Sequence, residues 1–156
     1  HTALSLCLGW WRSRIANERV LLGLSFPAVE LRCEPPNPAD DGISLRTAQL
    51  VDETAIRLLL RDNAPEGVER ACARARQWVA ALEHGPWRRA GLQAKRLLAE
   101  CVDAAGNRNE AKAVLAEVVG ICAEQGLRGY LLDAGPRVSD MQRDLHNDQE
   151  HSAAHR

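Results

Sequence analysis

Apolar side chains recur every three or four positions along most of this chain, a spacing that places them on one face of an α-helix. Four such segments follow one another, and turn-forming residues separate them: Asp62-Asn63-Ala64-Pro65, Gly85-Pro86 and Gly106-Asn107. Because each connection is short, consecutive helices should run antiparallel. The pattern predicts an all-α fold of stacked, antiparallel helix pairs.

Two helix–turn–helix units are expected, at residues 44–84 and 87–125. In the first unit, Ser44 is the expected N-cap of the first helix and Asn63 the expected cap of the second, with Pro65 in its first turn. The two units are offset by about 40 residues, a period typical of helical solenoids. One unit cannot bury its apolar faces alone, so the units should stack on each other.

Each expected helix has an apolar face that should turn inward. In the first unit these faces comprise Ala48, Val51, Ala55, Ile56 and Leu59, and then Val68, Ala71, Cys72, Ala75, Val79 and Leu82. In the second unit they comprise Leu92, Leu98, Ala99, Val102 and Ala105, and then Ala111, Val114, Leu115, Val118, Val119 and Cys122. The outer side of the second helix is expected to carry Arg70, Arg74, Arg76 and Glu83.

The chain is expected to divide into four regions. Residues 1–33 are predicted to form an N-terminal helical segment and residues 34–42 a proline-rich loop. Residues 43–145 form the predicted repeat domain with a C-terminal capping helix, and the polar residues 146–156 form a predicted disordered tail. An incomplete array would leave apolar ends exposed, so pairing of two copies into a homodimer through residues 1–25 is expected.

Composition limits the classes of function. The 156 residues contain 46% hydrophobic residues and carry a formal net charge of −1, which gives no general electrostatic attraction for nucleic acid or an anionic membrane. No apolar run approaches the roughly 20 residues of a membrane-spanning helix, and the first residues lack a secretory-signal pattern. Five widely separated cysteines suit a reducing cytoplasm. The first residue is His1, not methionine, as expected of a fragment of a longer protein.

The second unit resembles a tetratricopeptide repeat (TPR). The large, small, turn-glycine, small and bulky positions of that repeat are occupied by Leu98, Ala99, Gly106, Ala111 and Leu115. The departures are Lys95, Val102 and Val118, at positions that usually hold Trp, Tyr and Ala, and Gly67 at the packing-alanine position of the first unit. The resemblance implies a short right-handed superhelix in which the first helix of each pair lines a groove.

A second resemblance lies after the last predicted helix. The run Gly126-Leu127-Arg128-Gly129-Tyr130-Leu131-Leu132-Asp133-Ala134-Gly135-Pro136 is similar to a segment that closes TPR-like arrays in ATP-dependent, LuxR-type (MalT-like) transcriptional regulators. In that family the segment reads Gly-Leu-x-Arg-x-Phe-Leu-Asp-Glu-Gly-Pro. Here Leu131 replaces the Phe, Ala134 replaces the Glu, and Arg128 stands one position early.

This closing segment is expected to cap the array. Tyr130, Leu131 and Leu132 would cover the open end of the last helix pair. Asp133 would cap a short closing helix, which carries Val138, Met141 and Leu145. The resemblance implies a signal-sensing or protein-interaction region of a LuxR-family regulator, and the ATPase and DNA-binding domains of such a regulator lie outside this chain. DNA would then be contacted only indirectly.

The candidate binding residues lie on and before the third helix. Gln93, Arg96, Glu100 and Asp103 fall on the side opposite its apolar face, where a protein or peptide partner or a small inducer could bind in the repeat groove. Trp87 and Arg88, followed by Arg89, stand at a turn where an indole and a guanidinium could hold an anionic or aromatic ligand. The plainer alternatives are a solvated helix face and a Trp that joins two helices.

The sequence gives no support for catalysis, a cofactor or a metal. It contains no phosphate-binding loop and no nucleophile motif. His146, His151 and His155 have only a loosely metal-like spacing and lie in the predicted tail, where a metal site is not expected. The chain is therefore predicted not to be an enzyme. Two hypotheses remain: the sensor region of a LuxR-type regulator, and a free-standing TPR-like adaptor whose peptide binding would weaken on charge reversal at Arg96.

Overall fold

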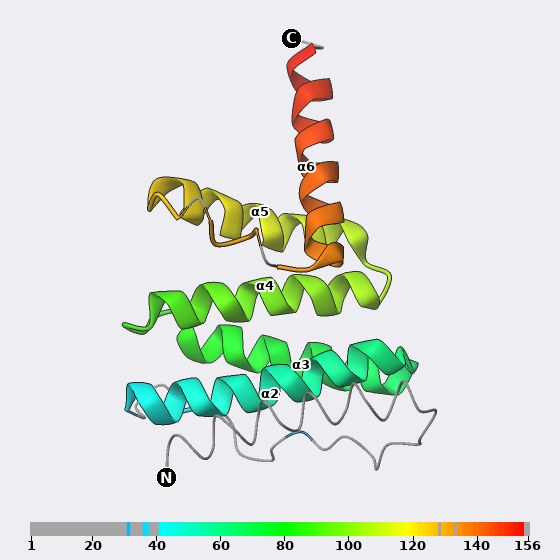
Figure 1. The fold of residues 1–156 in the computed structure, drawn as a ribbon. Helices are drawn as coiled ribbons and strands as arrows, with labels where there is room; N and C mark the ends of the chain where they lie inside the picture. Colours follow the sequence, from blue (N-terminus) through cyan, green and yellow to red (C-terminus); the bar gives the residue numbers. More distant parts are fainter. Residues whose placement is uncertain (1–30, 32–35, 38–40, 128, 133, 155–156) are drawn as a thin grey trace.

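The computed structural model describes residues 31, 36–37, 41–127, 129–132 and 134–154. Five helices form this described part of the chain, and Figure 1 shows the first four lying side by side in a stack. They are α2 (Gly42–Asp62), α3 (Pro65–Leu82), α4 (Arg88–Ala104), α5 (Arg108–Glu124) and α6 (Pro136–Ala154). The all-α prediction is confirmed. The expected helix within residues 1–33, the dimer contact of residues 1–25 and most of the 34–42 loop lie outside the described residues.

Helix α2 begins one turn earlier than the cap predicted from the sequence. The Oδ1 atom of Asp41 accepts hydrogen bonds from the backbone N–H groups of Ile43 and Ser44, at 3.0 and 3.1 Å. The Ser44 hydroxyl donates to Oδ2 of the same carboxylate, at 2.6 Å. Asp41 is therefore the N-cap, and the prediction of Ser44 is wrong because a carboxylate satisfies these donors and complements the positive end of the helix.

The turn between α2 and α3 also differs from the prediction. Asn63 adopts the left-handed conformation with φ 55°, and its backbone N–H donates to the Leu59 carbonyl, at 3.1 Å. It therefore ends α2 and does not cap α3, since this conformation cannot continue a helix but is one that Asn tolerates. Ala64 stands at the N-cap of α3, and Pro65 occupies the first turn as expected.

The helices stack as pairs. Each helix packs against the next along the chain, and α2 also contacts α4, as α4 contacts α6. Helix α4 lies at the centre of this stack, so residues on most of its sides are buried. The TPR-like positions Leu98, Ala99, Ala111 and Leu115 are all in the core. The small side chains of Ala99 and Ala111 let α4 and α5 approach closely.

The buried face of α2 matches the predicted apolar stripe only in part: Ile56 and Leu59 are buried as expected, but the other predicted positions are not. The buried residues are Leu45, Gln49, Asp52, Glu53, Ile56, Leu59 and Leu60. Ala48, Val51 and Ala55, which were predicted to face inward, are only half-buried. The helix is therefore rotated so that three polar side chains face its neighbours.

A buried carboxylate explains part of this rotation. Oδ2 of Asp52 accepts hydrogen bonds from Nε of Arg74 and from the indole N–H of Trp78, both at 2.8 Å. All three side chains are buried, and Asp52 has no exposed surface. The prediction that Arg74 lies on the outer side of α3 is therefore wrong, because its guanidinium is drawn inward to balance a buried charge.

The closing helix is longer than predicted. Val138 and Met141 are fully buried as expected, but α6 continues to Ala154, and Figure 1 shows it standing steeply to the stack. The prediction of a disordered tail from residue 146 is wrong for residues 146–154. The side chain of Asp148 forms an ion pair with Lys112 on α5, so interhelical contacts continue past residue 145.

The cap itself is partly as predicted. Leu131 is 9% exposed and Ala134 is 3% exposed, so both join the core, and Tyr130 packs against it. Leu132 is 79% exposed, and the prediction that it covers the last helix pair is wrong. Successive side chains of this turn point in different directions, so neighbouring residues cannot all face the core. Arg128 and Asp133 lie outside the described residues.

The buried Asp52 generates a stability prediction. Asp52→Asn keeps the shape of the side chain but leaves the Arg74 guanidinium buried without its counter-charge. We expect the free energy of unfolding to fall by about 3–5 kcal/mol, measured by urea denaturation. Asp140→Asn is the matched control, because Asp140 pairs with Arg143 on the surface and should contribute at most about 1 kcal/mol. Equal losses in the two variants would contradict the central role of Asp52.

Candidate functional site

Three of the residues predicted to line a groove on α4 face α2. Gln93 donates from Nε2 to Oε2 of Glu53, at 2.7 Å, and the guanidinium of Arg96 lies 3.9 Å from Oε1 of the same residue. Glu100 forms an ion pair with Arg57, at 3.0 Å. Arg57 also pairs with Glu53, at 3.0 Å. These five side chains form one polar network that joins the first helices of the two units.

The network leaves little of the predicted groove residues exposed. The side chains of Arg96 and Glu100 are 12% and 7% exposed. Charge reversal at Arg96 would therefore disturb the contact between α2 and α4 as well as any bound partner. These positions do form a continuous polar face, but its main contacts are within the protein.

The surroundings of the Arg57–Glu100 ion pair disfavour the charge of Glu100 but favour the charge of Arg57. Burial raises the pKa of Glu100 above its ordinary value, and the attraction of Arg57 and Arg96 does not cancel this effect. Burial acts against the charge of Arg57 too, but the Glu100 and Glu53 carboxylates outweigh it and raise the pKa of this guanidinium. The difference arises because the Arg57 side chain is 40% exposed and keeps part of its hydration.

Asp103 takes part in a separate contact. Its two carboxylate oxygens accept from Arg108, at 2.8 Å, and from Arg137 on α6, at 3.2 Å. Arg108 also pairs with Asp144, at 2.7 Å. These ion pairs join α4, α5 and α6. Asp103 is thus a structural connection to the closing helix and lies apart from the other predicted groove residues.

The remaining predicted residues meet in a pocket of about 710 Å³ where α2 and α4 begin. We call it the basic pocket, and its lining is Gly42, Leu45, Arg46, Pro86, Trp87, Arg88, Arg89, Ala90, Gln93 and Tyr130. The structure thus brings Trp87, Arg88 and Gln93 together. Arg46 and Tyr130 were missed by sequence reasoning, because they come from segments about 40 residues away on either side and no local pattern links them to Trp87.

Trp87 has two roles in this pocket. Its ring lies against the first residue of α2, so close that a Cβ on Gly42 would stand 2.9 Å from the ring. It also packs beside the small buried cluster of Leu45, Trp78, Leu82 and Ala94. The indole therefore joins two helices, as the plainer alternative expected, and its half-buried surface also forms a wall of the pocket.

The charges of the basic pocket have one sign. Arg46, Arg88 and Arg89 are exposed, and no acidic residue belongs to the lining. Within the described part of the chain, neither Arg88 nor Arg89 forms an ion pair. The guanidinium of Arg96 stacks over the Tyr130 ring, 5.5 Å from its centroid. An anionic group in this pocket would find two guanidiniums without a competing carboxylate.

The N-terminus of α4, which lies at the basic pocket, also favours an anionic group there. Its N-cap is Trp87, which makes no side-chain hydrogen bond to the first turn. The first N–H groups of a helix need acceptors, and their combined dipole favours a negative charge. The geometry therefore suits a carboxylate placed at the beginning of α4.

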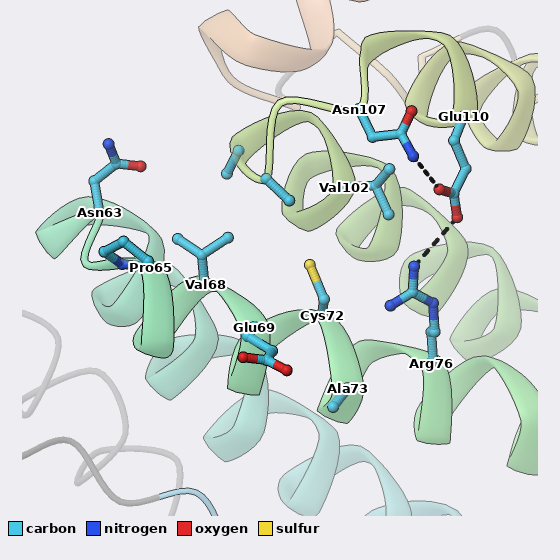
Figure 2. Close-up of a pocket in the computed structure, with 12 residues that line it drawn as sticks. Asn63, Pro65, Val68, Glu69, Cys72, Ala73, Arg76, Val102, Asn107 and Glu110 are labelled. Carbon is cyan, nitrogen blue, oxygen red and sulfur yellow. Dashed lines mark hydrogen bonds and ion pairs between the residues drawn. The ribbon is translucent and has the colours of Figure 1, made fainter.

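A second pocket, of about 580 Å³, lies at the other end of the stack, where α2 and α4 finish (Figure 2). Cys72 and Val68 of α3 line it together with Val102 of α4. At its edge, Glu110 pairs with Arg76, at 3.2 Å, and accepts from the Asn107 side chain, at 2.6 Å. The two pockets therefore differ in chemistry: one is basic, and the other contains a thiol beside one arginine and two glutamates.

Comparison with known proteins gives one group of relatives. The chain is 38% identical over 137 residues to the serine/threonine-protein kinase PknK of Mycobacterium tuberculosis, strains CDC 1551 and H37Rv, and of Mycobacterium bovis. The matched region is 86% of this chain and 12% of each relative. The chain therefore spans a small part of these kinases. No family model matches the chain, and no solved structure matches it.

The described residues contain neither a membrane-spanning helix nor a cluster of metal ligands. No helix among them is both long and apolar enough to cross a membrane. No group of three or more His, Cys, Asp or Glu side chains in the same residues is arranged to hold a metal ion. The basic pocket is thus the candidate site with the most distinctive chemistry.

The raised pKa of Glu100 generates a pH prediction. Between that raised pKa and the ordinary value of 4.5, Glu100 binds more protons in the folded protein than in the unfolded chain. The free energy of unfolding contributed by Glu100 should therefore rise as the pH falls through this window and stay level above it. We expect wild type to gain stability relative to Glu100→Gln on acidification, measured by urea denaturation at several pH values. A difference that stays constant or moves the other way would contradict the assignment.

Proposed function

We propose that this chain is a non-catalytic, TPR-like protein-interaction region of a larger signalling protein, and that it binds an acidic segment of a partner protein. The basic pocket carries the proposal. It presents the exposed guanidiniums of Arg46, Arg88 and Arg89 beside the indole of Trp87, without a carboxylate in its lining. Guanidiniums bind carboxylates with paired, charge-assisted hydrogen bonds, and the indole offers apolar surface to the partner's side chains.

A protein segment fits this pocket better than nucleic acid does. The chain as a whole has a net charge of −1, which gives no general electrostatic attraction to a phosphate backbone. Three arginines gather at one end of α2 and α4, where they line the basic pocket. A short run of Glu or Asp needs only such a local cluster.

The similarity to PknK supports a place in signalling. PknK is named as a serine/threonine-protein kinase, and this chain corresponds to 12% of its length. A helical-repeat region of that size is a recognition element more readily than a complete catalyst, because stacked repeats provide long surfaces for partners. On this proposal, partner binding at the basic pocket regulates an activity located elsewhere in the parent protein.

A second candidate is the signal-sensing region of a LuxR-type regulator. The segment 126–136 favours it, since this segment connects α5 to α6 and buries Leu131 and Ala134 as a cap should. The parent gene distinguishes the candidates. A phosphate-binding loop upstream and a helix-turn-helix downstream would support the LuxR-type regulator, whereas a protein-kinase domain would support the kinase. A gene that ends near Arg156 without either would support the free-standing adaptor.

The binding proposal predicts a specific effect of charge reversal. The probe is a fluorescein-labelled octaglutamate peptide, with octalysine as the charge control, and binding is measured by fluorescence anisotropy. Arg88→Glu combined with Arg89→Glu should weaken octaglutamate binding at least about tenfold, because two attractive charges become repulsive. Binding of octaglutamate beside Trp87 should also quench the tryptophan fluorescence of the wild-type protein. The double variant should lose this quenching together with the binding.

Two observations make this experiment decisive. Arg88 and Arg89 are exposed, so the double variant should keep the thermal stability and circular dichroism of wild type. Arg143→Glu is the matched control, because the Arg143 side chain is 71% exposed and lies on α6, outside the pocket lining. Equal weakening by both changes would indicate a general charge effect and would contradict binding at the basic pocket.

A further inference from the structure

Two cysteines meet where the first helix pair packs against the second. Cys72 on α3 is 5% exposed, and Cys101 on α4 is fully buried. The side chains are linked by a hydrogen bond between the thiols, and both are free of disulfide bonds. Both belong to the main hydrophobic core. Cys122, the other free cysteine in the described part of the chain, lies on α5.

Only one of the two thiols is accessible from a pocket. Cys72 lines the 580 Å³ pocket at the end of α2 and α4, and Figure 2 shows its sulfur pointing into that space. Cys101 is fully buried and absent from the lining, and its thiol is the hydrogen-bond partner of Cys72. The pocket is much larger than a water-sized oxidant needs, so a small peroxide can reach the Cys72 sulfur.

The surroundings favour the reactive form of Cys72. The hydrogen bond from Cys101 is the largest effect and lowers the pKa of Cys72 to about 7. The charge of Arg76 also lowers this pKa, whereas burial and the Glu110 carboxylate act to raise it. The pKa of Cys101 is raised by its hydrogen bond to Cys72 and by burial, so this residue keeps its proton. Burial alone raises the pKa of Cys122. A thiolate is the nucleophilic form of cysteine.

We propose that Cys72 and Cys101 are a redox modification site, in which hydrogen peroxide oxidises Cys72 and Cys101 then closes a disulfide between α3 and α4. The assignment rests on the pocket that exposes one sulfur and on the second, buried thiol that is its hydrogen-bond partner. It is independent of the proposed function, since neither cysteine lines the basic pocket.

The chemistry takes two balanced steps. The Cys72 thiolate attacks one peroxide oxygen, the O–O bond breaks, and hydroxide leaves and takes up a proton to become water. This step gives the sulfenic acid of Cys72. The Cys101 sulfur then attacks the Cys72 sulfur, the S–O bond breaks, and the departing hydroxyl group takes the Cys101 proton to form a second water. Two thiols are oxidised to one disulfide while one peroxide is reduced to two waters.

The disulfide would link α3 covalently to α4 and so stabilise the folded protein. Its loop encloses the turn between α3 and α4, which contains Trp87. The bond would fix the first helix pair to the second and restrict the unfolded chain. We therefore expect oxidation to raise the Tm by several degrees, and dithiothreitol to reverse the change.

The test uses the full chain with Cys7→Ser and Cys33→Ser, because those two cysteines lie outside the described residues. The protein is treated with a small molar excess of hydrogen peroxide, blocked with N-ethylmaleimide and digested for mass spectrometry. The expected product is a peptide pair joined through Cys72 and Cys101, and treatment with dithiothreitol should separate it.

Three further single variants distinguish the cysteine that is oxidised first from the one that closes the disulfide. Cys101→Ser should stop the reaction at the sulfenic acid, which dimedone labels at Cys72, whereas Cys72→Ser should abolish both dimedone labelling and the cross-link. Cys122→Ser, the matched control for a buried thiol, should leave the cross-link unchanged. Failure to form the Cys72–Cys101 peptide would overturn the proposal, as would oxidation of Cys122 at the same rate as Cys72.

Discussion

The carboxylate of Asp52 is the constraint from which the arrangement of α2 follows. It is fully buried, and the Arg74 guanidinium and the Trp78 indole both donate to one of its oxygens at 2.8 Å. A buried charge is stable only when its partners reach it, so α2 can rotate very little about its axis against α3. This fixed rotation turns Gln49 and Glu53 toward α4, where Gln49 donates to the Ala90 carbonyl, at 2.8 Å, and Glu53 accepts from Gln93.

Because α2 is held in this rotation, the polar side chains in the middle of α4 and those at its beginning have different surroundings. In its middle, the polar residues are occupied by contacts with Glu53 and Arg57, so this part of the predicted groove holds the two units together. At its beginning, Arg88 and Arg89 have no such partners in the described part of the molecule, and the turn residue Trp87 holds them beside α2. The arginines that we propose to bind a partner therefore lie at one end of the stack.

The opposite end of the stack has a different character. There the small residues Ala99 and Ala111 let α4 and α5 approach closely, and Cys72 and Cys101 occupy the contact between α3 and α4. A bond between those thiols would join the same two helix pairs that the polar network of Glu53 joins near the middle of α4. The polar network and the proposed disulfide would therefore both hold the first helix pair against the second.

The sequence by itself determined the helices, their antiparallel order and the apolar core of α4 and α5. Periodicity and turn residues are local properties, and Gly106 and Gly126 do end their helices at positive φ. The tertiary structure alone decided which polar residues are buried. Apolar periodicity could not reveal that Asp52 and Arg74 face inward, because the stabilising partner of each lies on another helix. Arg46 and Tyr130 joined the basic pocket for the same reason: residues about 40 positions apart become neighbours only when repeats stack.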